Sequence, residues 1–273
     1  MQPSIEQPLK WDERFTARTL DVYFTLTGSV EPRRADLVVW PETAAPTVLR
    51  RDPGLQRALE SLSAAISAPI LVGSVDAQDG LRNTAFLLSE RGLVGRYDKM
   101  HLVPFGEYVP LSRVIGFIRS WAEFISELEP GSHAVVFSGP PAPFGVVICY
   151  EGIFPDLFRM FVRGGARLMV NMTNDGWFGR TGGPLQHLAM YPFRAVEHRV
   201  AVVRTANTGI SAFIEPSGRI VRQLGLFERG TMIERVPLRS VETLYTRWGD
   251  WVAYVGFVVS GLVLTIAGTR GRS

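Results

Sequence analysis

Three residues of this sequence have the side chains that thiol-dependent acyl chemistry requires. Cys149 is the single cysteine and ends the apolar run GVVIC, Glu42 follows the run LVVWP, and Lys99 follows GRYD. Forming an acyl-thioester takes a thiolate, a base for the proton, and a cation for the oxyanion that develops on the carbonyl. Cys, Glu and Lys at the ends of three such runs could supply these functions together.

Each of the three residues also has an ordinary structural interpretation when it is taken alone. A lone cysteine is commonly a buried packing residue, Glu42 could cap a loop or a helix, and Lys99 could be a solvated charge. The turn from a strand to a helix at Cys149 favours the chemical interpretation, because a helix N-terminus stabilises an anion. We therefore expect the pKa of the Cys149 thiol to be lowered.

The composition excludes several classes of site. A single cysteine allows neither an intrachain disulfide nor a cysteine-ligated zinc cluster, and the four histidines show no H-E-x-x-H spacing. We therefore expect no metal and no cofactor. The formal net charge is only +3 and the basic residues are scattered, so we expect no nucleic-acid partner, while an anionic membrane surface is compatible with the sequence.

The chain alternates short apolar runs with amphipathic stretches, which predicts one α/β domain over residues 1–245. Arg91-Gly92 and Ser217-Gly218 are hairpin turn signals, so part of the sheet is expected to be antiparallel. The predicted strands are 36–40, 70–75, 84–89, 93–97, 145–149, 168–172, 201–205, 211–215 and 220–223. The predicted helices are 12–26, 54–66, 154–164 and 184–198.

The segment WVAYVGFVVSGLVLTIAG, residues 251–268, carries no charge. It would be roughly 27 Å long as a helix. Trp248, Trp251 and Tyr254 at its start, and Arg270 and Arg272 beyond its end, are placed as in a membrane span. A buried core helix is the alternative. We predict a transmembrane helix over 248–268 and a short basic tail over 269–273.

Two stretches, 104–132 and 176–183, do not follow the alternating pattern. Long irregular segments inside a compact domain are usually functional loops or lids. The first is rich in proline and aromatic residues, and the second contains Trp177 and Phe178. Asn174-Asp175-Gly176, between the predicted strand 168–172 and the second stretch, is a turn signal. A second interpretation is that Asp175 supports the site.

The motifs around the three reactive residues resemble one superfamily. Glu42 stands in WPE, Lys99 in YDKMHLVPFGE and Cys149 in ICYE, an order that resembles the nitrilase or carbon–nitrogen hydrolase superfamily. Within it, the sequence is most similar to the apolipoprotein N-acyltransferases, through IEQPLKW, HLVPFGEYVP, NDGWFG and RTANTGISAFIEPSGR. These motifs extend over nearly the whole chain. The resemblance implies a nitrilase-like α-β-β-α sandwich.

The resemblance also implies a role for each member of the triad. Cys149 would take an acyl chain from a phospholipid as a thioester and pass it to the N-terminal amine of a diacylglyceryl-cysteine apolipoprotein. Glu42 would be the general base. Lys99 would stabilise the oxyanion together with the backbone N–H of Tyr150.

Further residues match supporting positions of the family. Glu107, in PFGEYVP, corresponds to an acid that orients the triad, and Glu151 to an acid beside the nucleophile. Glu107 could instead pair with Lys99 for structural reasons alone. Trp11, Tyr150, Trp177 and Phe178 correspond to aromatic positions near the site or on its mobile loops. Trp11, Trp177 and Phe178 could also be ordinary packing residues.

The location follows from the same resemblance. It implies a monomer in the bacterial inner membrane, with the catalytic domain on the periplasmic face. Members of the family carry a bundle of membrane helices before this domain, and this sequence starts where the first strand should be ending. We therefore expect a fragment of a longer protein, with a partner that supplies the helices as the alternative.

Two other functions remain open at this point. A soluble amidase or nitrilase-type hydrolase would use the same triad with water in place of the amine, although it would need neither the apolar segment 251–268 nor the apolar loop 104–132. A membrane-anchored binding module with a degenerate site is the non-enzymatic alternative. The presence of Glu42, Lys99 and Cys149 together argues against it.

Overall fold

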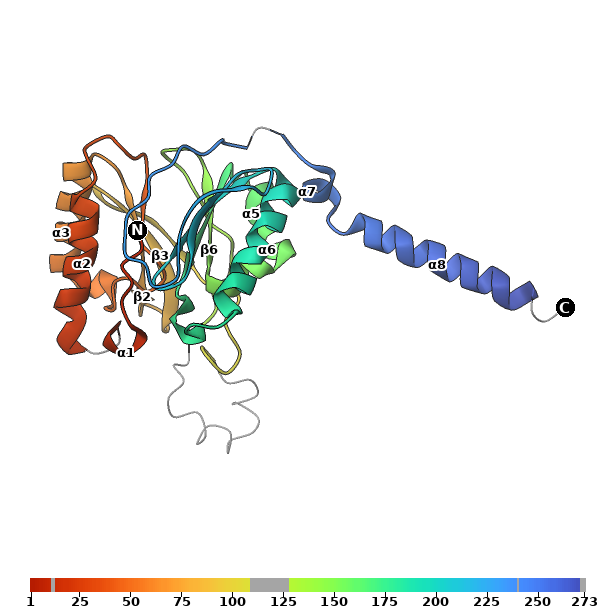
Figure 1. Cartoon of the computed structure of the whole chain (residues 1–273), viewed down its shortest axis with the longest axis horizontal. Coiled ribbons are helices and arrows are strands. Elements are labelled where there is room, and N and C mark those ends of the chain that lie inside the picture. Colours follow the sequence, from red (N-terminus) through yellow and green to blue (C-terminus); the bar gives the residue numbers. More distant parts are fainter. Residues whose placement is uncertain (11–12, 109–127, 240, 271–273) are drawn as a thin grey trace, which may run out of the picture.

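The computed structural model describes residues 1–10, 13–108, 128–239 and 241–270. Four layers are stacked side by side, with a helical layer outside each of two β-sheets (Figure 1). The first helical layer is α2 (Thr16–Gly28) and α3 (Pro53–Ile66), and the second is α5 (Pro155–Arg163) and α6 (Gly183–His198). The predicted α-β-β-α sandwich is confirmed.

The first sheet brings the ends of two separate strands to one edge. Its order is β1 (Val38–Val39), β2 (Ile70–Asp76), β3 (Arg82–Ser89) and β4 (Gly92–Asp98). Strands β1 and β2 are parallel, whereas β2–β3 and β3–β4 are antiparallel pairs. Strands β1 and β4 therefore run in the same direction, and the residues that follow them emerge at the same edge.

The second sheet is parallel at its centre. Its order is β10 (Ile220–Leu224), β9 (Ser211–Ile214), β8 (Ala201–Ala206), β7 (Leu168–Thr173), β6 (Phe144–Ile148) and β5 (Val136–Phe137). Strands β6, β7 and β8 pair in parallel. Residues that follow parallel strands meet at the carboxyl edge of the sheet, which is where open α/β sheets place their sites.

Alternating side chains of the first sheet fill two separate cores. On β2, Ile70 and Val72 pack with the helical layer of α2 and α3, while Leu71 between them packs with the second sheet. Strand β3 repeats the pattern with Phe86 on the helical side and Leu87 on the sheet side. Because successive strand side chains point to opposite faces, an almost entirely apolar run is buried on both sides.

The predicted strands and helices correspond to observed elements, with boundaries shifted by a few residues. The predicted helix 12–26 is the poorest match, because the regular helix α2 starts only at Thr16, after a 3₁₀ turn (Glu13–Phe15). The predicted hairpins are the antiparallel pairs β3–β4 and β9–β10. Short elements that were not predicted include α1 (Gln7–Lys10), β5 and α7 (Leu244–Trp248).

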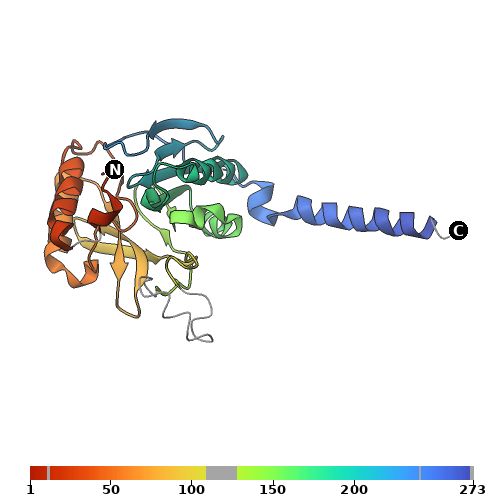
Figure 2. The ribbon, with the colours of Figure 1, turned by 60° about the horizontal axis from the view of Figure 1, so that its bottom comes forward.

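The C-terminal helix α8 (Trp251–Arg270) extends away from the sandwich (Figures 1 and 2). Gly249 has a φ of 64° and ends α7, so the helix starts later than the predicted 248. Within the described ranges, no helix is long and apolar enough to cross a membrane. The predicted transmembrane helix is therefore not found.

Candidate active site

Glu42 lies in a tight turn directly after β1. A Cβ atom on Gly73 of β2 would lie 2.3 Å from the carbonyl oxygen of Pro41 and 2.9 Å from Cα of Glu42, so only glycine lets β2 pass beneath this turn. The next residue, Thr43, has a φ of 43°, a conformation that is uncommon for a β-branched residue. The backbone of this turn is therefore closely constrained on both sides.

Hydrogen bonds fix both oxygens of the buried Glu42 carboxylate. Oε1 accepts a hydrogen bond from the side-chain amide of Asn83 at 2.7 Å, and Oε2 accepts one from the backbone N–H of Asn174 at 2.8 Å. The ammonium nitrogen of Lys99 lies 3.5 Å from Oε1. Residues from both sheets thus hold the carboxylate in one orientation.

Lys99 follows β4 and is held between two carboxylates. Its Nζ donates to Oε1 of Glu107 at 2.8 Å, and the amide of Asn83 also contacts that oxygen at 3.2 Å. Burial lowers the pKa of Lys99, but the charges of Glu42, Cys149 and Glu107 more than offset this, so its pKa is raised. The side chain is 1% exposed and remains a cation at any ordinary pH.

Cys149 follows β6 with a φ of 54° and starts a 3₁₀ turn, Cys149–Ile153. The left-handed conformation is costly for a residue with a side chain and is frequent at functional sites. Burial, reinforced by Glu42 and partly offset by Lys99, raises the pKa of its thiol to about 12. The prediction of a lowered pKa is therefore wrong, because desolvation outweighs the helix N-terminus. The thiol is protonated at rest and needs a base.

Glu151 connects the loop of Cys149 to the loop of Lys99. The carboxylate is fully buried and accepts hydrogen bonds from the backbone N–H groups of Met100, His101 and Ile148, at 2.7, 3.0 and 2.7 Å. The hydroxyl of Tyr97 donates to the same carboxylate. Burial raises the pKa of Glu151 to about 7, although these donors act in the opposite direction. Glu151 therefore positions the residues around it rather than facing a substrate.

The main-chain carbonyl of Cys149 accepts hydrogen bonds from two buried side chains. The amide of Asn171 donates to it at 3.0 Å, and the hydroxyl of Tyr191 donates at 3.0 Å. Arg204 contacts Oδ1 of Asn171 at 2.6 Å and Oδ2 of Asp175 at 2.6 Å. The second oxygen of Asp175 lies 2.9 Å from Nδ1 of His187. This network holds the strained turn of the cysteine from inside the second sheet.

We expect Asp175→Asn to destabilise the fold strongly. Arg204 and Asp175 are each 1% exposed, and removing one partner of a buried ion pair costs about 3–5 kcal/mol because the other charge stays unpaired. The midpoint of urea unfolding measures the loss. Glu215→Gln is the matched control, since its ion pair with Arg219 is at the surface, and it should leave the midpoint nearly unchanged. Equal effects of the two substitutions would contradict the role of the buried pair.

The predicted aromatic residues have different surroundings. The ring of Tyr150 lies with its centroid 5.9 Å from Nζ of Lys99, and its hydroxyl donates to the carbonyl of Leu102 at 3.0 Å. Trp177 and Phe178 are 70% and 43% exposed after Asp175, so they are not packing residues of the core. Trp11 lies outside the described residues, as does most of the loop 104–132.

Several residues of the site were not predicted from the sequence. Asn83, which contacts both Glu42 and Glu107, lies within β3, and Arg204 and Tyr191 lie within a strand and a helix. A charged residue in the middle of the apolar run RVAVVRTA was a usable signal, because arginine is seldom buried without a partner. The amide of Asn83 gave no comparable signal.

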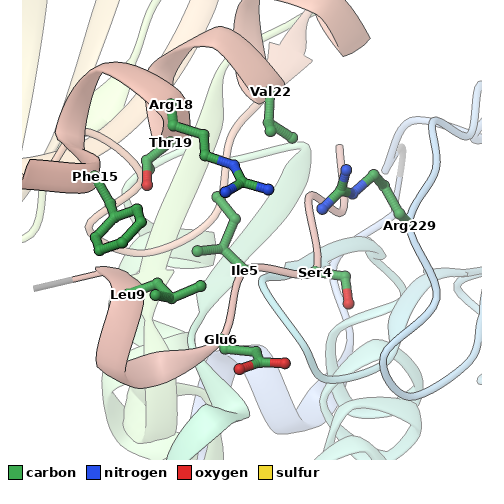
Figure 3. Close-up of a pocket in the computed structure, with 9 residues that line it drawn as sticks. All are labelled: Ser4, Ile5, Glu6, Leu9, Phe15, Arg18, Thr19, Val22 and Arg229. Carbon is green, nitrogen blue, oxygen red and sulfur yellow. The ribbon is translucent and has the colours of Figure 1, made fainter. Parts of the chain in front are cut away.

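A separate pocket of about 220 Å³ lies away from the triad. Arg18 and Arg229 approach it from opposite sides, Ile5 lies beside Arg18, and Leu9 lies near Phe15 on the side away from Arg229 (Figure 3). The other lining residues are Ser4, Glu6, Phe15, Thr19 and Val22. Glu42, Lys99 and Cys149 do not line this pocket.

The fold, two sheets packed between two helical layers, is that of the carbon–nitrogen hydrolases. Residues 7–245 match this family, and the chain belongs to it. Solved structures agree on the fold. An amidase from Nesterenkonia sp. AN1 superposes with a TM-score of 0.58 at 18% identity, covering 77% of this chain and 84% of the amidase. A Saccharomyces cerevisiae protein of the nitrilase superfamily gives a TM-score of 0.56 at 22% identity, covering 78% and 79%.

Within the family, the chain is similar to proteins named apolipoprotein N-acyltransferase. The protein from Geobacter metallireducens is 39% identical over 99% of this chain and 53% of its own length. The protein from Chlorobaculum tepidum is 34% identical over 100% of this chain and 57% of its own length. The chain therefore spans about half the length of the curated relatives it matches.

Proposed function

We propose that this chain is the catalytic domain of an apolipoprotein N-acyltransferase. It would move an acyl chain from a phospholipid to the N-terminal amine of a diacylglyceryl-cysteine apolipoprotein through a thioester on Cys149. The observation that carries the proposal is the gathering of Glu42, Lys99 and Cys149 in a chain that is 39% identical to a protein of that name.

In the first half-reaction, the proton of the Cys149 thiol passes to Glu42 as the sulfur attacks the ester carbonyl of the phospholipid. A C–S bond forms, and the oxyanion is stabilised by the ammonium of Lys99 and by the backbone N–H of Tyr150. Collapse of the tetrahedral intermediate breaks the C–O bond. The departing alcohol takes the proton back from Glu42, and the acyl chain remains on sulfur.

In the second half-reaction, the amine of the apolipoprotein attacks the thioester carbonyl. Glu42 accepts the proton that the amine loses as the C–N bond forms. The C–S bond breaks, the product leaves as an amide, and the proton returns to sulfur. Glu107 keeps Lys99 in place in both half-reactions, through the contact at 2.8 Å between Nζ and Oε1.

We also propose that α8 holds the domain at the bacterial inner membrane, with the site on the periplasmic face. Its exposed side chains are apolar on every side of the helix, including Phe257 at 76% and Leu264 at 72%. A helix that is apolar all round is normally buried, and a bilayer would bury it. Trp177 and Phe178, exposed near the site, would then contact the apolar part of the lipid substrates.

The acceptor distinguishes this function from amide hydrolysis, because a thioester on the same triad can react with water instead. The chain is reconstituted with liposomes, floated with them to check that α8 associates with lipid, and acylated on Cys149. Decay of the acyl-enzyme is then followed with and without a diacylglyceryl-cysteine peptide. We expect slow decay that the lipopeptide accelerates and an unlipidated peptide does not. Fast decay that neither peptide changes would support the amidase instead.

A further inference from the structure

Lys10 is buried against the turn that contains Glu42. It ends α1, its side chain is 2% exposed, and its Nζ donates to the main-chain carbonyl of Glu42 at 2.8 Å. The preceding residue, Leu9, lines the separate pocket (Figure 3). Helix α1 thus lies between that pocket and the site, and Lys10 is its contact with the catalytic turn.

The choice of lysine at this position is informative. The chain has only two lysines among its 29 basic residues, Lys10 and Lys99, and both are buried beside Glu42. All other basic residues are arginines. An ammonium is a compact point charge whose pKa responds to its surroundings, whereas a guanidinium is larger and always charged. Lysine thus occurs only at the two positions that contact Glu42.

Lys10 adds a positive charge to the group of charged residues around Glu42. Glu42 and Glu107 carry two negative charges, and Lys99 contributes one positive charge. When the Cys149 proton moves to Glu42, the negative charge moves from the carboxylate to sulfur, and the total charge of the group is unchanged.

The pKa of Lys10 agrees with this position. Burial lowers it to about 8, and the negative charges of Glu42 and Cys149 act in the opposite direction. A lysine with a pKa of about 8 is still mainly charged at neutral pH. The charge of Asp175 also acts on Cys149, but Arg204 already pairs with it at 2.6 Å. Lys10 interacts with Cys149 itself, whose charge raises the pKa of Lys10.

We propose that Lys10 is a positioning residue of the active site. It holds the Glu42 turn through the main-chain carbonyl, and its charge stabilises the thiolate of Cys149. Lys99 differs from it, because Lys99 contacts the carboxylates of Glu42 and Glu107 and faces the oxyanion. The inference rests on the proposed nucleophilic role of Cys149, so its test measures the reactivity of the thiol and not acyl transfer.

The test is the alkylation of the single cysteine by iodoacetamide as a function of pH, in the unsubstituted chain, Lys10→Met and Lys10→Arg. We expect Lys10→Met to react about 10-fold more slowly at neutral pH, because losing one nearby positive charge raises the thiol pKa by about one unit. Lys10→Arg keeps the charge and should react within about threefold of the unsubstituted chain. Circular dichroism and the thermal midpoint check that both variants are folded.

Two results would overturn the inference. The first is a folded Lys10→Met protein that alkylates at the unsubstituted rate throughout the pH range. The second is an equal loss of rate in Lys10→Met and Lys10→Arg, because the charge would then be irrelevant. If alkylation depends on Lys10 as expected but no acyl transfer can be found, the proposed function fails while this inference stands.

A second measurement determines the pKa of Lys10 directly, by NMR titration of a protein that keeps this lysine. Selective ¹³C labelling of lysine should give two signals, and the spectrum of Lys10→Arg assigns them. We expect the Lys10 signal to titrate near pH 8 and to shift to lower pH in Glu42→Gln, which removes a nearby negative charge. A midpoint near the unperturbed value of about 10.4, or one that Glu42→Gln does not move, would overturn the proposal.

Discussion

Replacing Cys149 with serine should abolish the acyl-enzyme and lower the rate of acyl transfer by about 10⁴-fold or more, as loss of a covalent nucleophile does in other enzymes. No other residue can form the thioester, because Cys149 is the only cysteine. Its turn is held by the Asn171 and Tyr191 contacts to its carbonyl, which the serine keeps. The fold should therefore be retained while the chemistry is lost.

The measurement is the mass of the protein after incubation with phospholipid or with an activated acyl ester. The unsubstituted chain should gain one acyl group, which neutral hydroxylamine removes because it cleaves thioesters. The activated ester tests the triad without requiring the lipid substrate to be bound. A hydroxylamine-sensitive acyl group that persists in Cys149→Ser would refute the assignment of the nucleophile.

Changing Glu42 to glutamine should lower the rate of thioester formation by roughly 10²-fold or more. The reason is the raised pKa of about 12 at the Cys149 thiol, which leaves almost no thiolate at neutral pH unless a base takes the proton. Without that base, the thiol must ionise on its own. The rate in Glu42→Gln should then rise about tenfold for each pH unit until the pH reaches the pKa of its thiol, which no longer has the raising effect of the Glu42 charge. The unsubstituted chain should show no such rise above neutral pH.

Lys99→Met tests the stabilisation of the oxyanion during thioester formation. It should lower the rate of thioester formation by a similar factor, roughly 10²-fold. The cation is lost from the oxyanion, and Glu42 and Glu107 lose the charge that lies between them. Arg91→Met is the matched control, because Arg91 directly precedes strand β4 and its side chain is 89% exposed. It should acylate normally.

Burst kinetics with the activated ester measure both substitutions, with circular dichroism to confirm the fold. A folded Lys99→Met protein with near-normal acylation would exclude the oxyanion role. A Glu42→Gln protein whose rate is unchanged and independent of pH would exclude the role of general base. Each result would leave the assignment of Cys149 as nucleophile untouched, since that assignment depends on the acyl adduct itself.

The elements that carry the triad were predictable because local pattern determines them. Strand β2 is a run of apolar residues bounded by Pro69 and by polar residues after Asp76, and α3 has a proline at its start and a side-chain cap from Asp52. Glu42, Lys99 and Cys149 each follow such a strand. Their proximity could be inferred only from the motifs that resemble a known family, since no local pattern measures the distance between strand ends.

The pKa of Cys149 shows where local reasoning fails. The start of a helical turn predicts a lowered pKa for the thiol. Burial of the thiol raises its pKa instead, and the negative charges of Glu42 and Asp175 act in the same direction as burial. Desolvation depends on everything that surrounds a group. That surrounding shell comes from both sheets and several loops, and no stretch of sequence contains it.

The sequence by itself determined the reactive residue types, the alternating elements and the hairpins, because those follow from side-chain chemistry and backbone periodicity within a few neighbouring residues. Only the tertiary structure decided that Asn83 contacts Glu42 and Glu107, that Arg204 and Asp175 pair beneath Cys149, and that Lys10 is buried at the Glu42 turn. These contacts join residues separated by up to 41 positions. They arise when strands that are distant in the sequence pair within a sheet and the segments that follow them meet at its edge, and that pairing depends on the whole chain.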